Sequence, residues 1–285
     1  MFIQELWAGE AGRIDATMQE LVFAGLAGRK YEKILKFGDT VNIGTRGHLT
    51  AQTKAKASNT ALSFETVTEL NTTLTVATWE YSGIAVESIV DKQSMVDQMA
   101  MYAPEQGYAL NLAVDDVLAG LVDDTTNAVG TLGVSLSYDN LLTGIQNLDD
   151  ANRRGKRVLV TAPAQFYDWM KLDVFMRSDY VEIHGNADAR GLKDGMQGNT
   201  RKNWLNIPIY MSTNVEGSNA AGHDNCVMEL GGMQLVMQIA PRAHRQKDIN
   251  YLCDKVVLEQ LYGTKLMPIA SSITTYEAVV WLKGL

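Results

Sequence analysis

The chain has 285 residues, 46% hydrophobic and 20% charged, which is the composition of an ordinary folded protein. Its formal charge of −8 and pI of about 5.1 argue against non-specific binding to nucleic acid phosphates and against an acidic membrane surface as partner. The N-terminus lacks the pattern of a secretory signal, no run approaches the ~18 apolar residues of a membrane span, and two cysteines without a CxxC pair favour a reducing compartment.

The first 36 residues form an N-terminal segment with one short helical pattern. Its apolar residues at near-helical spacing are Met18, Leu21, Val22 and Leu26. Trp7 lies upstream, and a large aromatic side chain is costly to leave exposed. We therefore expect Trp7 to dock on another surface, with a frayed terminus as the alternative.

A long arm follows from Phe37 to Asp91, and its two ends have strand patterns. Polarity alternates over Thr40–Ile43. On the return, one face of the chain carries Leu70, Thr72, Leu74, Val76 and Thr78. We expect a firmly packed base at Val41, Ile43, Leu74 and Val76.

The middle of the arm is polar. Between Gly44 and Thr66 the only large apolar side chains are Leu49, Leu62 and Phe64. Such a segment cannot bury enough apolar surface to offset its own ordering entropy. Its tip is therefore either disordered or held by another protein, which suggests a protein that works by assembling.

The next pattern predicts a helix of about five turns over residues 105–122. Pro104 fits its first turn, where a missing N–H costs little. The apolar stripe is made of Leu110, Val114, Val117, Leu118 and Leu121. The pairs Asp115-Asp116 and Asp123-Asp124 fall mostly off this stripe. Adjacent helical residues point about 100° apart, so a solvated face is favoured over a cation site.

Residues 137–215 have an α/β pattern. Ser137 fits the N-cap of a helix that carries Leu141, Leu142, Ile145 and Leu148. Arg157–Thr161 reads as a buried strand, and Pro163 fits the start of a second helix. We expect a surface loop over 184–203. A short strand follows over Ile207–Tyr210, whose proline indicates an edge strand or a strand start.

The rest of the chain is predicted to be mostly strand, with a hairpin turn at Gly231-Gly232. The candidate strands are Cys226–Leu230, Gln234–Ile239, Ile249–Leu261 and Glu277–Leu282.

Signals for chemistry are weak. The four histidines lack metal-ligand spacing, His223-Asp224 reads as part of a solvated loop, and Cys226 reads as a small core residue. The chain has no GxSxG, P-loop or HExxH motif. We predict no catalytic residue, no metal and no cofactor, and hence no enzyme.

Two basic features remain. Residues 153–157, which include Arg153 and Arg154, read as a solvated helix-to-strand turn; contact with phosphate or with an acidic neighbour are the alternatives. Lys54 and Lys56 lie at the arm tip. A covalent crosslink from such a lysine to a neighbour's asparagine is a further hypothesis, but no partner asparagine can be identified.

The succession of motifs resembles the major capsid protein of tailed double-stranded DNA bacteriophages, with the Hong Kong 97-type fold. The motifs are, in order, Trp7, Val22–Leu26, Arg29–Glu32, Phe37–Ile43, Trp79, Gly83–Val86, Val160–Pro163 followed by Phe175, and Pro208–Val215. The Gly-Asp-Thr-Val entry into the arm is the most specific of them.

The resemblance implies an α+β capsid fold with five parts. These are an N-terminal arm over 1–36, an extended loop over 37–80, a peripheral domain with a long spine helix over 81–136, an axial domain over 137–225, and strands over 226–285 that return to the axial and peripheral domains.

The resemblance further implies a function in the virion, with assembly in the host cytoplasm. Subunits would form the hexamers and pentamers of an icosahedral shell that encloses double-stranded DNA without sequence-specific binding. Scaffolding, portal and cement proteins are implied partners. Predicted intersubunit contacts are Trp7, Leu49, Lys54, Lys56, Leu62, Phe64, Arg153 and Arg154. The alternatives are an encapsulin-type compartment shell, a soluble α+β enzyme and another virion part.

Overall fold

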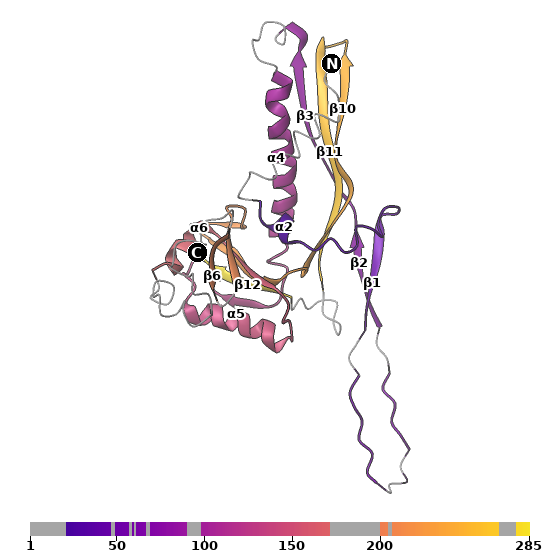
Figure 1. Ribbon diagram of the computed structural model, residues 1–285, viewed down its shortest axis with the longest axis vertical. Helices are drawn as coiled ribbons and strands as arrows, with labels where there is room; N and C mark the ends of the chain where they lie inside the picture. Colours follow the sequence, from indigo (N-terminus) through magenta and orange to yellow (C-terminus); the bar gives the residue numbers. More distant parts are fainter. Residues whose placement is uncertain are drawn as a thin grey trace, which may run out of the picture.

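The computed structural model describes residues 21–46, 49–56, 59, 61–66, 69–89, 98–171, 200–204, 207–267 and 278–285. These residues form three sheets, of two, three and seven strands. Figure 1 shows an elongated subunit, in which a tall helix-and-sheet unit stands above a second, more compact unit. A thin two-stranded arm projects downward from the junction.

The compact unit is built on the seven-stranded sheet, in the order β4-β12-β9-β5-β7-β6, with β8 pairing β9. Its strands are β4 (Ala128–Gly130), β5 (Arg157–Thr161), β6 (Thr200–Trp204), β7 (Ile207–Met211), β8 (Gly217–Ser218), β9 (Gly222–Glu229) and β12 (Val279–Gly284). The predicted buried strand is confirmed as β5, which lies between β9 and β7.

Two helices pack against this sheet, and both start as expected. Helix α5 (Tyr138–Asp150) begins where the Ser137 hydroxyl accepts a hydrogen bond from the Asn140 N–H at 3.2 Å. Helix α6 (Pro163–Trp169) begins at its proline. Their buried residues join one apolar core, which includes Leu141, Leu148, Phe166 and Trp169.

Three details of this unit differ from expectation. Leu142 is 37% exposed, because it lies on the outer side of α5. The predicted loop over 184–203 is wrong at its end, where Thr200 begins β6; residues 184–199 lie outside the described residues. Strand β7 lies between β5 and β6, so Pro208 is not on an edge strand, although it is near the strand start as the alternative had it.

The tall unit pairs one long helix with the three-stranded sheet, in the order β10-β11-β3. Its elements are β3 (Thr78–Glu87), α4 (Gln98–Ala119), β10 (Met233–Asp248) and β11 (Cys253–Leu266). The hairpin of β10 and β11 turns at residues 249–252, where a strand was predicted. Such a turn leaves Ile249 and Leu252 exposed at the far end of the unit.

Helix α4 starts earlier than predicted, so Pro104 lies inside it rather than at its start. A proline there removes one backbone hydrogen bond of the helix. Packing of the same turn offsets this loss. Ala103 is fully buried, and the Gln106 side chain donates to the carbonyl oxygens of Ser82 and Val256 at 3.1 and 3.4 Å.

The predicted hairpin at Gly231-Gly232 is wrong. Gly231 has a φ of 91° and the Gly232 N–H donates to the Glu229 carbonyl, so a tight turn does form. However, β9 already pairs with β12 and β5. The next strand, β10, therefore enters the other sheet, and the two glycines form a crossing between the two units.

The arm begins with two antiparallel strands, β1 (Thr40–Arg46) and β2 (Glu69–Thr75). Their register pairs Thr40 with Thr75 at one end and Arg46 with Glu69 at the other. The expectation of a packed base is confirmed. Ile43, Leu74 and Val76 are buried and Val41 is half-buried, in a cluster with Leu35 and Val236. Side-chain burial alternates from Thr72 to Val76, as the predicted strand face requires.

Backbone contact fixes the arm base at Gly263, near the C-terminal end of β11. A Cβ atom at residue 263 would overlap the Thr75 carbonyl oxygen, so only glycine fits there. We expect Gly263→Ala to lower the free energy of unfolding by about 1–3 kcal/mol, because neither backbone can move freely. Urea unfolding measures this change.

Gly25→Ala is the matched control, because a Cβ at residue 25 would meet no atom within 4 Å. Equal stability changes in the two variants would contradict the close contact between β11 and the arm.

Candidate assembly surfaces

Three apolar side chains of the arm tip are largely exposed in the part of the chain that the structure describes. Leu49, Leu62 and Phe64 are 66%, 60% and 88% exposed. Figure 1 shows that the arm points away from both units. Exposed apolar side chains grouped on one surface are typical of sites that bind another protein, so contacts at Leu49, Leu62 and Phe64 stay a prediction.

Polar contacts tie the two halves of the tip together. The Thr50 N–H donates to the Glu65 carboxylate at 2.9 Å, and the Gln52 side chain donates to it at 3.0 Å. The Thr50 hydroxyl bonds the same carboxylate, and these bonds lower the pKa of Glu65. The tip is thus a closed loop rather than two loose chains.

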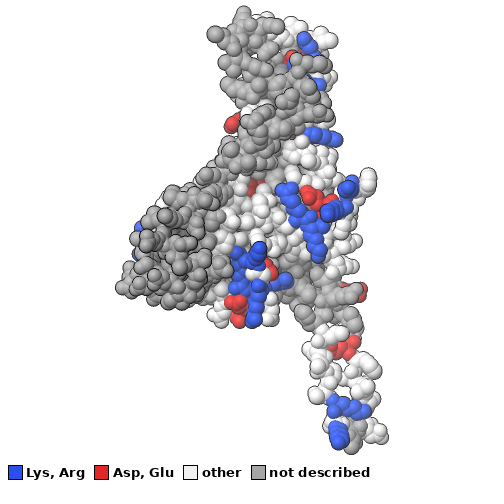
Figure 2. Space-filling view, in the orientation of Figure 1, with Lys and Arg blue, Asp and Glu red and all other residues white. Residues whose placement is uncertain are grey.

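The tip also carries charge. Lys54 and Lys56 are exposed, and they are the only lysines or arginines between residues 47 and 68. Figure 2 shows basic side chains at the far end of the arm. Trp7, the other predicted contact in the N-terminal half, lies outside the described residues.

The basic turn lies between α5 and β5, as predicted. Arg154 is exposed and Arg153 is half-buried. Arg157 points back to the helix, where its guanidinium lies 2.6 Å from the Asp149 carboxylate and holds the pKa of Asp149 below its usual range. Figure 2 shows these basic side chains gathered beside the end of α5. A role for Arg153 and Arg154 in contacts with phosphate or a neighbour stays a prediction.

A further exposed surface lies on the three-stranded sheet. Trp79 and Tyr81 are 68% and 75% exposed on β3. The Glu259 carboxylate holds the Trp79 indole N–H at 2.9 Å and also contacts Arg242 and His244, which lower its pKa. No local sequence pattern indicates this cluster, because its members come from the three strands β3, β10 and β11.

An open groove of about 440 Å³ lies between β3 and α4. It is lined by Trp79, Glu80, Tyr81, Ser82, Ala109, Leu110 and Ala113. The lining is mostly apolar, but it includes Glu80, whose carboxylate accepts hydrogen bonds from Gln260 at 3.1 Å and from Tyr262 at 2.8 Å.

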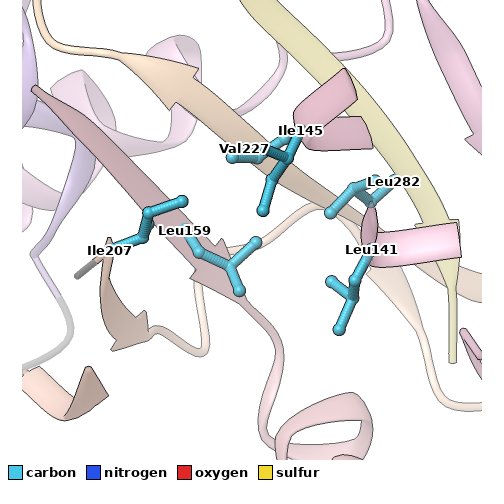
Figure 3. Close-up of a pocket in the computed structure, with 6 residues that line it drawn as sticks. All are labelled: Leu141, Ile145, Leu159, Ile207, Val227 and Leu282. Carbon is cyan, nitrogen blue, oxygen red and sulfur yellow. The ribbon is translucent and has the colours of Figure 1, made fainter. Parts of the chain in front are cut away.

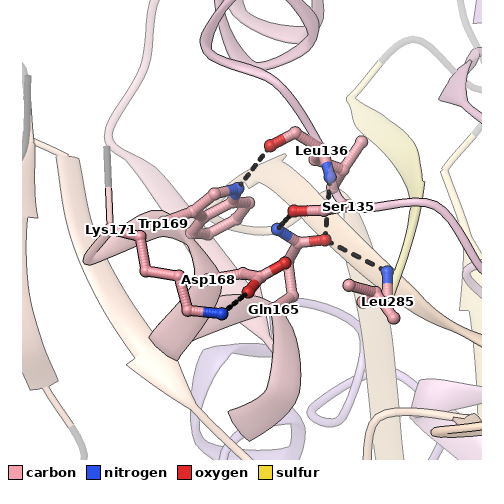
Figure 4. A network of polar contacts seen from close by, with 7 residues as sticks. All are labelled: Ser135, Leu136, Gln165, Asp168, Trp169, Lys171 and Leu285. Carbon is pink, nitrogen blue, oxygen red and sulfur yellow. Dashed lines mark hydrogen bonds and ion pairs between the residues drawn. The ribbon is translucent and has the colours of Figure 1, made fainter. Parts of the chain in front are cut away.

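An apolar seam lies inside the compact unit, between α5 and the sheet. Six apolar side chains from α5 and four strands surround a seam too narrow for a water molecule: Leu141, Ile145, Leu159, Ile207, Val227 and Leu282 (Figure 3). Nearby, Gln165 accepts hydrogen bonds from the N–H groups of Leu136 and Leu285, both at 3.0 Å (Figure 4). This network anchors the C-terminus to α6.

Two polar residues are buried where a solvated setting was expected. His223 lies on β9, and its ring nitrogens contact the Val215 carbonyl at 3.4 Å and the Asn219 side chain at 3.0 Å. Asp115 is fully buried on α4. A signal for Asp115 existed, since it precedes the buried residues Leu118, Ala119 and Val122 by three, four and seven positions.

The remaining site predictions concern metals, thiols and membranes. Cys226 is buried as predicted, and burial raises the pKa of its thiol to about 12. Within the described residues, no group of three or more His, Cys, Asp or Glu side chains is placed to hold a metal ion. None of the helices in the described ranges is long and apolar enough to cross a membrane.

The architecture belongs to the class of phage capsid folds. A chain from Mycobacterium phage Che8 matches with a TM-score of 0.75 at 21% identity, over 92% of this chain and 91% of that one. The capsid structure of cyanophage P-SCSP1u matches with a TM-score of 0.64 at 13% identity, over 92% and 87% of the two chains. The mature capsid of bacteriophage PhiM1 gives 0.59 and 16%, over 87% and 83%.

No family model matches the sequence, and no curated protein does. The structural likeness, at these identities, establishes the fold. The chain has the α+β, Hong Kong 97-type fold of tailed-phage major capsid proteins, as its motifs predicted.

The base and tip of the arm should respond differently to truncation. Leu74 is fully buried, so we expect Leu74→Ala to cost about 2–5 kcal/mol of unfolding free energy. Phe64 is exposed, so we expect Phe64→Ala to change the stability of the free subunit by less than about 0.5 kcal/mol. Urea unfolding of unassembled protein distinguishes the two, and a large loss in Phe64→Ala would contradict an uncovered tip.

Asp115 should make stability depend on pH. Burial raises the pKa of its carboxyl, although hydrogen bonds from Ala24 and Asn214 oppose the change. The folded state therefore binds this proton more tightly than the unfolded chain does. The group's contribution to stability is fully present at low pH and is lost as pH rises through the raised, folded-state pKa.

Asp115→Asn removes this titration. We expect the stability of the original protein, relative to Asp115→Asn, to fall as pH rises from about 4 to about 7. Unfolding in urea at a series of pH values measures the difference. If the original protein instead gains stability relative to Asp115→Asn as pH rises, the pKa of Asp115 is lowered rather than raised.

Proposed function

We propose that the chain is a major capsid protein, whose hexamers and pentamers form an icosahedral shell around double-stranded DNA. The observation that carries this proposal is the arm. Its base is packed into the subunit and its apolar tip is uncovered, in a chain with a phage capsid fold. A neighbouring subunit supplies the missing cover.

The proposed division of the chain follows the expected one. Residues 1–36 are the N-terminal arm, 37–80 the extended loop, 81–136 the peripheral domain with α4 as its spine, and 137–225 the axial domain. The last segment, 226–285, is divided between the two, because β12 pairs in the seven-stranded sheet whereas β10 and β11 form the three-stranded one. We assign residues 128–130 to the axial part as well, a choice supported by the pairing of β4 with β12.

Contacts between subunits would be heterologous, because the arm tip and the surface that covers it are different parts of the same chain. Leu49, Leu62 and Phe64 supply the apolar contact, and Lys54 and Lys56 orient it by charge. Trp7, Arg153 and Arg154 are proposed as further contacts.

The shell would be part of the virion and would assemble in the host cytoplasm, with scaffolding, portal and cement proteins as partners. The acidic composition supports enclosure of DNA without tight or sequence-specific binding.

Electron microscopy and a size measurement on the purified chain test the proposal. We expect particles of megadalton size from the original protein. We expect the double variant Leu62→Ala/Phe64→Ala to fold but to remain unassembled, because it loses most of the apolar surface of the tip. Thr53→Ala is the control, since it alters an exposed polar residue of the same tip.

A stable monomer at high concentration would overturn the proposal. Particles that hold a cargo enzyme instead of DNA would identify an encapsulin-type compartment, which is the second candidate.

A further inference from the structure

The buried carboxylate of Asp115 joins three parts of the chain. Its two oxygens accept hydrogen bonds from the N–H groups of Ala24 at 2.8 Å and of Val22 at 3.4 Å. The Asn214 side chain donates to the same carboxylate at 3.1 Å. Ala24 lies 91 positions from Asp115 along the chain, and Asn214 lies 99 positions from it. Both therefore meet at one side chain of α4.

The N-terminal part depends on this contact. Helix α2 (Phe23–Leu26) has only four residues, and Val22 at its N-cap forms no side-chain cap. A helix this short is unstable by itself, and its first N–H groups need an acceptor. Asp115 provides the acceptor, and burial of Val22 and Phe23 completes the docking.

The same segment also binds the tall unit. Gly28 bridges to Gln234 at the start of β10, with its N–H donating to Met233 at 2.8 Å and its carbonyl accepting from Leu235 at 2.9 Å. A Cβ atom at residue 28 would overlap the Gln234 amide. Residues 22–28 are therefore attached at two points, on α4 and on the edge of β10.

Asn214 connects Asp115 and the segment docked on it to the compact unit. It follows β7, between Ser212, whose N–H donates to Thr161 of β5, and Val215, which is buried in the shared core. That core contains residues of α2, of α4 and of both larger sheets. Elsewhere within the described residues, the units are linked along the chain at 120–127 and at the glycine crossing 231–232.

We propose that residues 22–28, held by Asp115, act as a staple that fixes the angle between the two units. When the staple is docked, α4, β10 and the segment after β7 move as one body. When it is released, the shared core and the chain crossings hold the units alone, and the angle between the units varies more widely. The position of the N-terminal segment and the shape of the subunit are then coupled. The inference does not rest on the proposed function, because it concerns a single subunit.

Asp115→Leu tests the staple, because leucine keeps an apolar bulk but accepts no hydrogen bond. Hydrogen exchange of the full chain should become about tenfold faster at residues 22–28 and 212–216, with the arm and the far end of α4 unchanged. Asp115→Asn should retain most of the protection, because its carboxamide oxygen still accepts from Ala24. Asp116→Leu on the same helix is the exposed control.

A distance measurement tests the coupling. Spin labels at Lys247→Cys and Arg154→Cys report one unit each, since both positions are exposed and both native cysteines are buried. The labelled chain is diluted with unlabelled chain, so that each distance lies within one subunit. We expect a narrow distance distribution in the otherwise original protein and in Asp115→Asn, and a broad or displaced one in Asp115→Leu.

Gly28→Val provides a second route if Asp115→Leu fails to fold. The valine side chain displaces the Gln234 side chain and crowds the backbone pairing of Gly28 with Met233 and Leu235, without changing Asp115. Where hydrogen exchange shows that residues 22–28 are released, we expect the same broadening. The proposal is overturned if residues 22–28 exchange at the original rate in both variants. It is also overturned if they are released while the distance distribution stays narrow, since the segment would then be docked without controlling the angle.

Discussion

The constraint on which the rest of this structure depends is the attachment of a projecting arm to a rigid sheet. Leu74 and Ile43 anchor the arm in a small apolar cluster, and Gly263 lets the two backbones touch. Because the base is fixed, the tip is held away from the body with its apolar side chains uncovered. The arm is therefore packed at its base and exposed at its tip.

The two units exist because the strands of the chain are divided between two separate sheets, one of seven strands and one of three. The chain enters the compact sheet, crosses at Gly231-Gly232 into the three-stranded sheet, and returns with β12. Neither sheet is completed by a continuous stretch of sequence. The shared core and the Asp115 junction therefore determine how the two units are placed, and both involve the N-terminal segment.

Much of this was predictable from local pattern. Alternating polarity identified the strands at the arm base, and Ser137 and Pro163 marked two helix starts. The failures involve partners distant in sequence. Asp115 and His223 are buried polar residues. Ala24 and Asn214 donate hydrogen bonds to Asp115, and Val215 and Asn219 contact the ring nitrogens of His223. No local sequence pattern reveals these partners. The prediction of a tight turn at Gly231-Gly232 was correct, but the predicted hairpin was wrong. The sheet that β10 joins depends on which edges of β9 are already paired.

The central claim is that the tip of the arm is completed by another copy of the chain. A cryo-electron microscopy reconstruction of the assembled protein tests it most directly. The account predicts that Leu49, Leu62 and Phe64 are buried against a neighbouring subunit, while the packing of Leu74 in its own subunit is unchanged. Assembled particles in which these three side chains remain exposed to solvent would contradict it.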